Sequence, residues 1–144
     1  MPAIATIIIF IILLAVKSLF NFDLFPALIV FLAIKNKPEE TIACAALAGF
    51  IEDALFYAGC IHFLSFSIIG GLAVFLKKFF SFDEDDLALA LVVILAPLSV
   101  VITAFGMKLF QNAEFPSLVF TAVRSLIVNG LAVLAVNYFF WRRR

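Results

Sequence analysis

The chain has 144 residues, 66% of them hydrophobic, and its 10 basic and 10 acidic side chains leave a net charge of zero at pH 7. Soluble domains are about 45–50% apolar, so a mean hydropathy of +1.23 excludes a water-soluble fold. The sequence therefore predicts an all-α integral membrane protein, with residues 1–144 forming a single transmembrane helical domain.

Apolar runs divided by polar or helix-breaking residues predict a bundle of six transmembrane helices, at about residues 3–20, 21–35, 41–58, 61–80, 87–110 and 117–140. The second run is short, because a helix needs about 20 residues to cross the hydrocarbon core. It is therefore either a short span or a re-entrant segment. No positive charge precedes the first run and no cleavage motif follows it, so we expect a span rather than a signal peptide.

Basic residues between the spans predict the topology. With six spans, one side of the membrane holds Lys35, Lys37, Lys77, Lys78, Arg142, Arg143 and Arg144. The other side holds Lys17 and Lys108, which lie near span ends and could extend their ammonium groups to the surface. Because cytoplasmic loops carry the excess of Lys and Arg, we expect both termini in the cytoplasm.

The most informative ionisable residues within the predicted spans are Glu52, Asp53 and Arg124. Such residues are costly in a membrane unless they are paired or hydrated. Arg124 in the sixth span lies at a similar depth to the two acids in the third, so we expect it to pair with Asp53 or Glu52. Adjacent residues point about 100° apart on a helix, so the second acid would be protonated or face water. The charges either fix helix packing or form a ligand or ion site.

Other polar and small residues allow two interpretations each. His62 is either a polar tip at the outer surface or part of a polar cavity, and Asn129 is either an interhelical hydrogen-bonding group or a ligand-binding one. Gly49 and Gly130, like Gly70 and Gly71, predict close helix contacts. His62 is the single histidine, so no His/Cys cluster predicts a metal site. We expect no catalytic residues and no cofactor.

The segment AGFIEDALFYAGCIHFLSFSIIGGLAVFLKKFF resembles the central segment of the rod shape-determining protein MreD family. Gly49 and Asp53 fall on the family's Gly and Asp, and Gly59 falls in its small turn. The segment FPSLVFTAVRSLIVNGLAVLAVNYFFWRRR is similar to the family's last helix, with its Asn-Gly pair at Asn129 and Gly130, and DLFPALIVFLAIKNKPEE is similar to its second segment. Glu52 beside Asp53 departs from the family pattern.

This resemblance implies a non-enzymatic membrane scaffold in the bacterial inner membrane. The family works in the rod complex, or elongasome, which organises lateral peptidoglycan synthesis and cell shape. The implied partners are MreC, RodA, a penicillin-binding transpeptidase, MreB and the lipid bilayer, and no nucleic acid is expected. The implied fold is similar to the S-components of energy-coupling factor transporters. The alternative is such a substrate-binding subunit, in which Glu52, Asp53, Arg124 and Asn129 would line a pocket for a small polar ligand.

Overall fold

The computed structural model describes residues 3–20, 23–56, 59–80, 84–111 and 117–138, and these residues form six helices and no strand. The helices are α1 Ala3–Phe20, α2 Phe25–Lys35, α3 Pro38–Phe56, α4 Ile61–Lys77, α5 Glu84–Gln111 and α6 Leu118–Val136. The prediction of an all-α fold with six helices is confirmed. The first helix agrees with its predicted range, and the others differ by a few residues at their ends.

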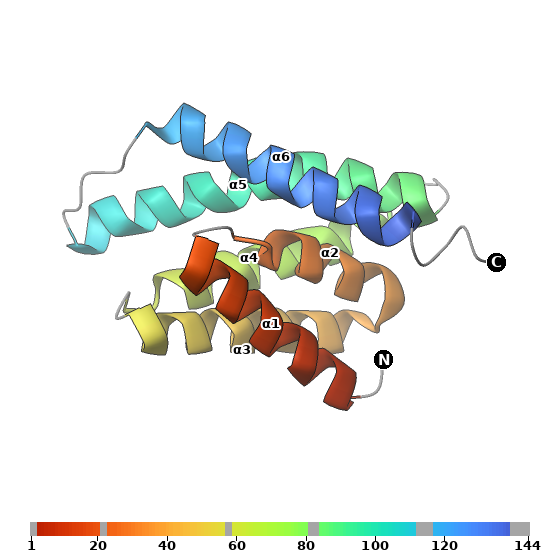
Figure 1. Cartoon of the computed structure of the whole chain (residues 1–144), viewed down its shortest axis with the longest axis horizontal. Helices are drawn as coiled ribbons and strands as arrows, with labels where there is room; N and C mark the ends of the chain where they lie inside the picture. The colour runs from red at the N-terminus through yellow and green to blue at the C-terminus, as the bar shows by residue number, and fades with distance from the viewer. Residues whose placement is uncertain (1–2, 21–22, 57–58, 81–83, 112–116, 139–144) are drawn as a thin grey trace.

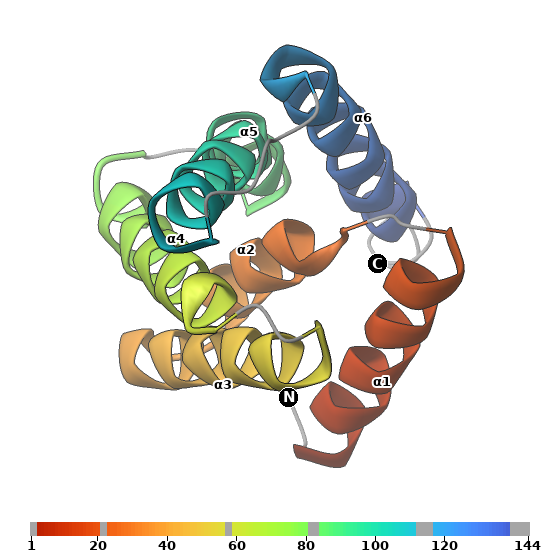
Figure 2. The same cartoon turned by 90° about the vertical axis from the view of Figure 1, so that its left-hand side faces the viewer.

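Helix α2 lies in the middle of the molecule, and the other five helices surround it (Figure 2). Seen from the side, α5 and α6 lie along one edge, and α1 and α3 lie along the opposite edge (Figure 1). The beginning of α1 and the end of α6 lie at the same end of the bundle (Figure 1). This arrangement follows from an even number of helices joined by short connections.

Helix α2 is short and almost completely buried. Its 11 residues extend over about 17 Å at 1.5 Å per residue, about half of a 30 Å hydrocarbon core. The ring of Phe25, at its first residue, packs 5.2 Å from the Phe10 ring of α1 and 5.5 Å from the Phe66 ring of α4. The predicted second span is thus a half-length central helix, beginning four residues later than expected.

The carboxyl end of α2 is capped by side chains from two neighbouring helices. The Thr41 hydroxyl of α3 donates to the Leu32 carbonyl at 3.0 Å. The Lys77 ammonium of α4 donates to the carbonyls of Ala33 and Ile34 at 3.0 and 2.9 Å. Because the last carbonyls of a helix have no partner within it, these contacts allow α2 to end inside the bundle.

Small residues bring α3 and α4 together. A Cβ atom at Gly49 would lie 2.6 Å from backbone atoms of His62 and Phe63, so no other residue fits there without a shift of the backbone. A Cβ atom at Gly70 would lie 2.9 Å from Ala45. These two predicted close contacts are confirmed. The same prediction is wrong for two glycines that have open space at the Cβ position, Gly71 and Gly130.

The outer surface of the bundle is strongly apolar. Large hydrophobic side chains are exposed on every helix except α2, including Ile11, Phe50, Phe75, Phe105 and Val119. Within the described part of the chain, two segments are long and apolar enough to cross a membrane, Asp86–Gln111 and Leu118–Val136. Exposed apolar patches of this extent are unusual on soluble monomers.

Candidate functional site

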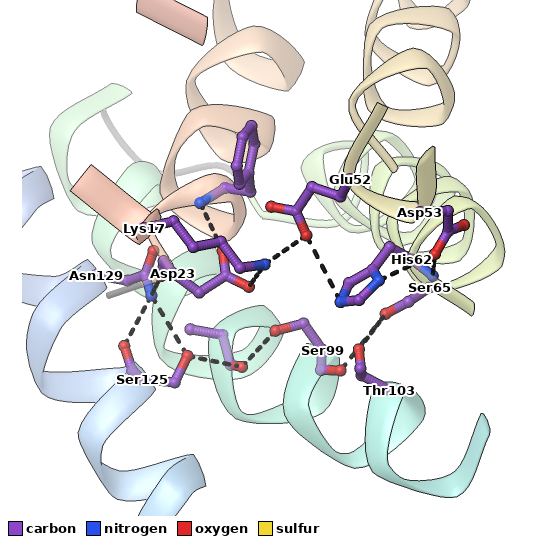
Figure 3. Close-up of polar contacts among 12 residues, drawn as sticks. Lys17, Asp23, Glu52, Asp53, His62, Ser65, Ser99, Thr103, Ser125 and Asn129 are labelled. Atoms are coloured by element: carbon purple, nitrogen blue, oxygen red, sulfur yellow. Dashed lines mark hydrogen bonds and ion pairs between the residues drawn. The ribbon is translucent and has the colours of Figure 1, made fainter. Parts of the chain in front are cut away.

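Five ionisable residues from four parts of the chain meet inside the bundle (Figure 3). We call them the charged cluster: Lys17 of α1, Asp23 before α2, Glu52 and Asp53 of α3, and His62 of α4. Sequence reasoning identified Glu52, Asp53 and His62 as candidates, and the structure brings these three together. It missed Lys17 and Asp23 as members of the site.

Glu52 is the most deeply buried member, with an exposed fraction of 0%. Its Oε2 atom accepts a hydrogen bond from the Lys17 ammonium and lies 3.6 Å from Nε2 of His62. Its other carboxylate oxygen, Oε1, is buried and has no hydrogen-bond partner among the residues that the structure describes. An unpartnered buried carboxylate oxygen is costly, because the atom has lost its water without gaining a donor.

Lys17 turns inward rather than towards the surface. Its side chain is only 15% exposed, and its ammonium also contacts Oδ2 of Asp23 at 3.3 Å. The ammonium lies 5.9 Å from the ring centre of Phe25 and 5.6 Å from that of Phe56, distances at which an aromatic face attracts a cation. The prediction that Lys17 extends to the membrane surface is therefore wrong.

The predicted pairing of Arg124 with the acids is also wrong, because Lys17 and His62 occupy the positions beside the two carboxylates. The Arg124 guanidinium instead donates to the Phe20 carbonyl at the end of α1, at 3.5 Å. The error has a physical reason. Residues at the same depth along the membrane normal can still face different directions, and the side of α6 that faces α3 depends on helix packing.

Asp53 caps the amino end of α4. Its Oδ1 and Oδ2 atoms accept from the backbone N–H groups of His62 and Phe63 at 2.9 and 2.8 Å. A carboxylate at this position satisfies donors that have no partner in the helix and lies at the positive end of the helix dipole. Gly59, with a φ of 69°, provides the left-handed turn residue that reverses the chain just before α4.

His62 is buried, so its interpretation as a surface polar tip is wrong. Its Nδ1 atom lies 3.0 Å from Oδ1 of Asp53, and its Nε2 atom faces Glu52. The imidazole therefore stands between two carboxylates that come from adjacent positions of α3 (Figure 3). Glu52 and Asp53 point in different directions, as their spacing predicts, and each has its own cationic or donor partner.

The amino end of α2 has two side-chain caps. Oδ1 of Asp23 accepts from the N–H of Phe25 at 3.0 Å, and Oδ1 of Asn129 accepts from the N–H of Ala27 at 3.0 Å. The Asn129 amide in turn donates to the Asp23 carbonyl at 2.9 Å and to the Ser125 carbonyl at 2.8 Å. Asn129 is fully buried and links α6 to α2, which agrees with its interpretation as an interhelical hydrogen-bonding group.

A row of hydroxyl groups continues from Asn129 across α5 to α4 (Figure 3). Ser125 and Ser99 both donate to the Ala96 carbonyl, at 3.3 and 2.7 Å. Ser65 donates to the Ser99 carbonyl at 3.4 Å, and Thr103 donates to the Ser65 hydroxyl at 3.1 Å. The row connects three helices without any charge. A signal was present in the sequence, since Ser99 and Thr103 are four residues apart and so share one face of a helix.

Within the described residues, no group of three or more His, Cys, Asp or Glu side chains is arranged to hold a metal ion. Comparisons of the chain with models of protein families, with curated proteins and with solved structures gave no match.

Proposed function

We propose that the chain is an integral membrane protein whose six helices cross or enter the bilayer, with both termini in the cytoplasm. The support is an apolar outer surface combined with ionisable groups gathered in the interior. This distribution is the reverse of that in soluble proteins and is what lipid requires. The half-length helix α2, capped by Lys77 and Asn129, would lie within the membrane but shielded from lipid by its neighbours.

We further propose that it acts as a non-enzymatic scaffold of the rod complex, similar to the MreD family. One observation carries this proposal most strongly: the polar groups of the interior are used to join helices to one another. Lys17 joins α1 to α3, Asp53 joins α3 to α4, and Asn129 joins α6 to α2. Such contacts favour one fixed arrangement of helices, which a scaffold needs to present a constant surface to its partners.

The segments that resemble the MreD family overlap with part of this internal framework. They contain α2, the last part of α3, α4 and α6, whereas α1, which carries Lys17, and α5 lie outside them. Gly49, Asp53 and Asn129, which fall on family positions, each make a contact between helices. The resemblance and the packing thus support the same proposal.

A substrate-binding subunit of an energy-coupling factor transporter is the second candidate. The observation in its favour is the unpartnered Oε1 atom of Glu52, because a buried acceptor could receive a donor from a small polar ligand. In this case the charged cluster would be the ligand site. The two candidates differ in the proteins with which the chain should assemble.

The test is affinity purification of the tagged chain from its own host in mild detergent, with partners identified by mass spectrometry. An unrelated multi-span protein with the same tag, produced at the same level, is the control. Enrichment of MreC, RodA or the penicillin-binding transpeptidase over this control is the expected result. Enrichment of energy-coupling ATPases with their transmembrane coupling subunit would overturn the scaffold proposal and favour the transporter subunit.

A further inference from the structure

The charged cluster contains more acids than bases. Three carboxylates, those of Asp23, Glu52 and Asp53, are accompanied by one ammonium, that of Lys17. With a neutral imidazole and all three acids ionised, the cluster would carry a net charge of −2. The Asp23 side chain is 36% exposed and so partly solvated, but Glu52 and Asp53 are buried. Uncompensated charge is costly in a buried site, so the excess negative charge must be neutralised in some other way.

Two of the three acids receive compensation from helix ends. Asp53 accepts from the first turn of α4, and Asp23 accepts from the first residue of α2. A helix amino end acts as roughly half a positive charge, so the two ends together offset about one of the two excess negative charges. Among the described residues, Glu52 accepts from no helix end and shares the Lys17 ammonium with Asp23, so about one negative charge of the cluster as a whole remains uncompensated.

The orientation of His62 points to the same atom. Its Nδ1 atom is 3.0 Å from a carboxylate oxygen of Asp53, so Nδ1 must carry a hydrogen and donate it. In a neutral ring, Nε2 then has a lone pair, and this lone pair faces Oε2 of Glu52 at 3.6 Å. Two acceptors that face each other in a buried site repel unless a proton lies on one of them.

We propose that Glu52 and His62 together bind one proton, held either as the carboxylic acid of Glu52 or as the imidazolium of His62. This proton would bring the cluster to approximate electrical neutrality and remove the conflict between the two acceptors. The site is independent of the scaffold role, because it rests on the charges and geometry of the cluster alone.

The groups that face this pair come from each neighbouring element. They are the Lys17 ammonium from α1, the Asp23 carboxylate from the segment before α2, and the Asp53 carboxylate from α3 itself. Helix α6 contributes the neutral amide of Asn129, which binds the Asp23 carbonyl. Raising the pH should therefore remove one proton from a site whose immediate surroundings carry one ammonium and two carboxylates.

The single histidine makes the test direct, because every imidazole signal comes from His62. The protein is labelled with ¹⁵N in its histidine ring, and the two ring nitrogens are followed by NMR in detergent or lipid over a pH series. Infrared spectra of the same samples report the carbonyl stretch of any protonated carboxylic acid. We expect either two protonated ring nitrogens or a carboxylic-acid band near neutral pH, with loss of one proton on raising the pH.

Two variants locate the proton. Glu52→Gln keeps the shape of the side chain and offers an amide N–H to Nε2, so it should abolish both the carboxylic-acid band and the titration. Glu40→Gln alters an exposed acid on the same helix and should leave both unchanged. A neutral ring with no carboxylic-acid band in the wild-type protein would overturn the proposal. A band that persists in Glu52→Gln would overturn it as well, because the proton would then lie on another acid.

Discussion

Replacement of Lys17 by Met tests whether this ammonium neutralises the buried acid Glu52. Methionine retains an apolar stem of similar length, which could still pack near the rings of Phe25 and Phe56. The variant therefore removes the charge with little change in packing. The pair is well shielded, since the side chains of Lys17 and Glu52 are 15% and 0% exposed.

The expected loss can be derived from this burial. Removal of one partner of a buried ion pair costs about 3–5 kcal/mol, because the other charge stays behind. An ordinary hydrogen bond between membrane helices contributes only about 0.6 kcal/mol on average. We therefore expect Lys17→Met to lower the free energy of unfolding by about 3 kcal/mol. The double variant Lys17→Met/Glu52→Gln should recover about 2 kcal/mol of this loss, because the buried carboxylate at position 52 is then absent and only the partly exposed Asp23 has lost its cation.

The assay is reversible unfolding in mixed micelles, with helix content followed by circular dichroism as the fraction of denaturing detergent increases. Lys37→Met, at an exposed position before α3, is the matched control and should change stability by less than about 0.5 kcal/mol. A loss for Lys17→Met no larger than for this control, with no recovery in the double variant, would refute the reasoning. A larger loss for Arg124→Met than for Lys17→Met would instead favour the pairing first expected from the sequence.

Three further substitutions test the packing and the helix caps. Gly49→Ala should lower the free energy of unfolding by about 1–3 kcal/mol, because the new Cβ would lie 2.6 Å from the backbone of α4. Gly71→Ala, which has open space at the Cβ position, is the control and should leave stability unchanged or raise it. Equal effects of the two substitutions would contradict the close contact at Gly49. Asn129→Leu should cost about 1–3 kcal/mol, since a buried N–H of α2 loses its acceptor, and hydrogen exchange of the first turn of α2 should become faster. Lys77→Met should cost about 1.5–3 kcal/mol through the two carbonyls at the end of α2, and an equal loss in the neighbouring variant Lys78→Met would show that this cap is not specific.

Some helix limits are local. Pro38 with Glu39 and Glu40 favours the start of a helix, since proline fits the first turn and acids favour its positive end. The predicted range began only at residue 41 because it followed hydropathy, which these polar residues interrupt. The limits of α2 were harder to predict. Its amino end depends on Asp23 and on Asn129, a residue more than 100 positions later. No local pattern encodes a cap that another helix supplies.

The charged cluster could be predicted in part. Acids in an apolar run identify Glu52 and Asp53 without any structure. The partner of Glu52 could not be chosen in the same way, because Lys17 and Arg124 both lie within about 10 Å of the outer ends of their predicted spans. The choice depends on the rotation of each helix about its own axis. That rotation depends on contacts between helices, such as the contact of Phe10 with Phe25, which the sequence alone does not show.

The central claim is that this chain forms a six-helix membrane bundle with its charges inside and both termini in the cytoplasm. The most direct test uses the exposed Cys60, in the turn before α4, after Cys44→Ala has removed the second cysteine. In intact cells, a membrane-impermeant maleimide should label Cys60 from outside. In a cysteine-free background, Lys37→Cys should be labelled only after the cells are opened. Labelling of both positions in intact cells, or of Lys37→Cys alone, would contradict the account.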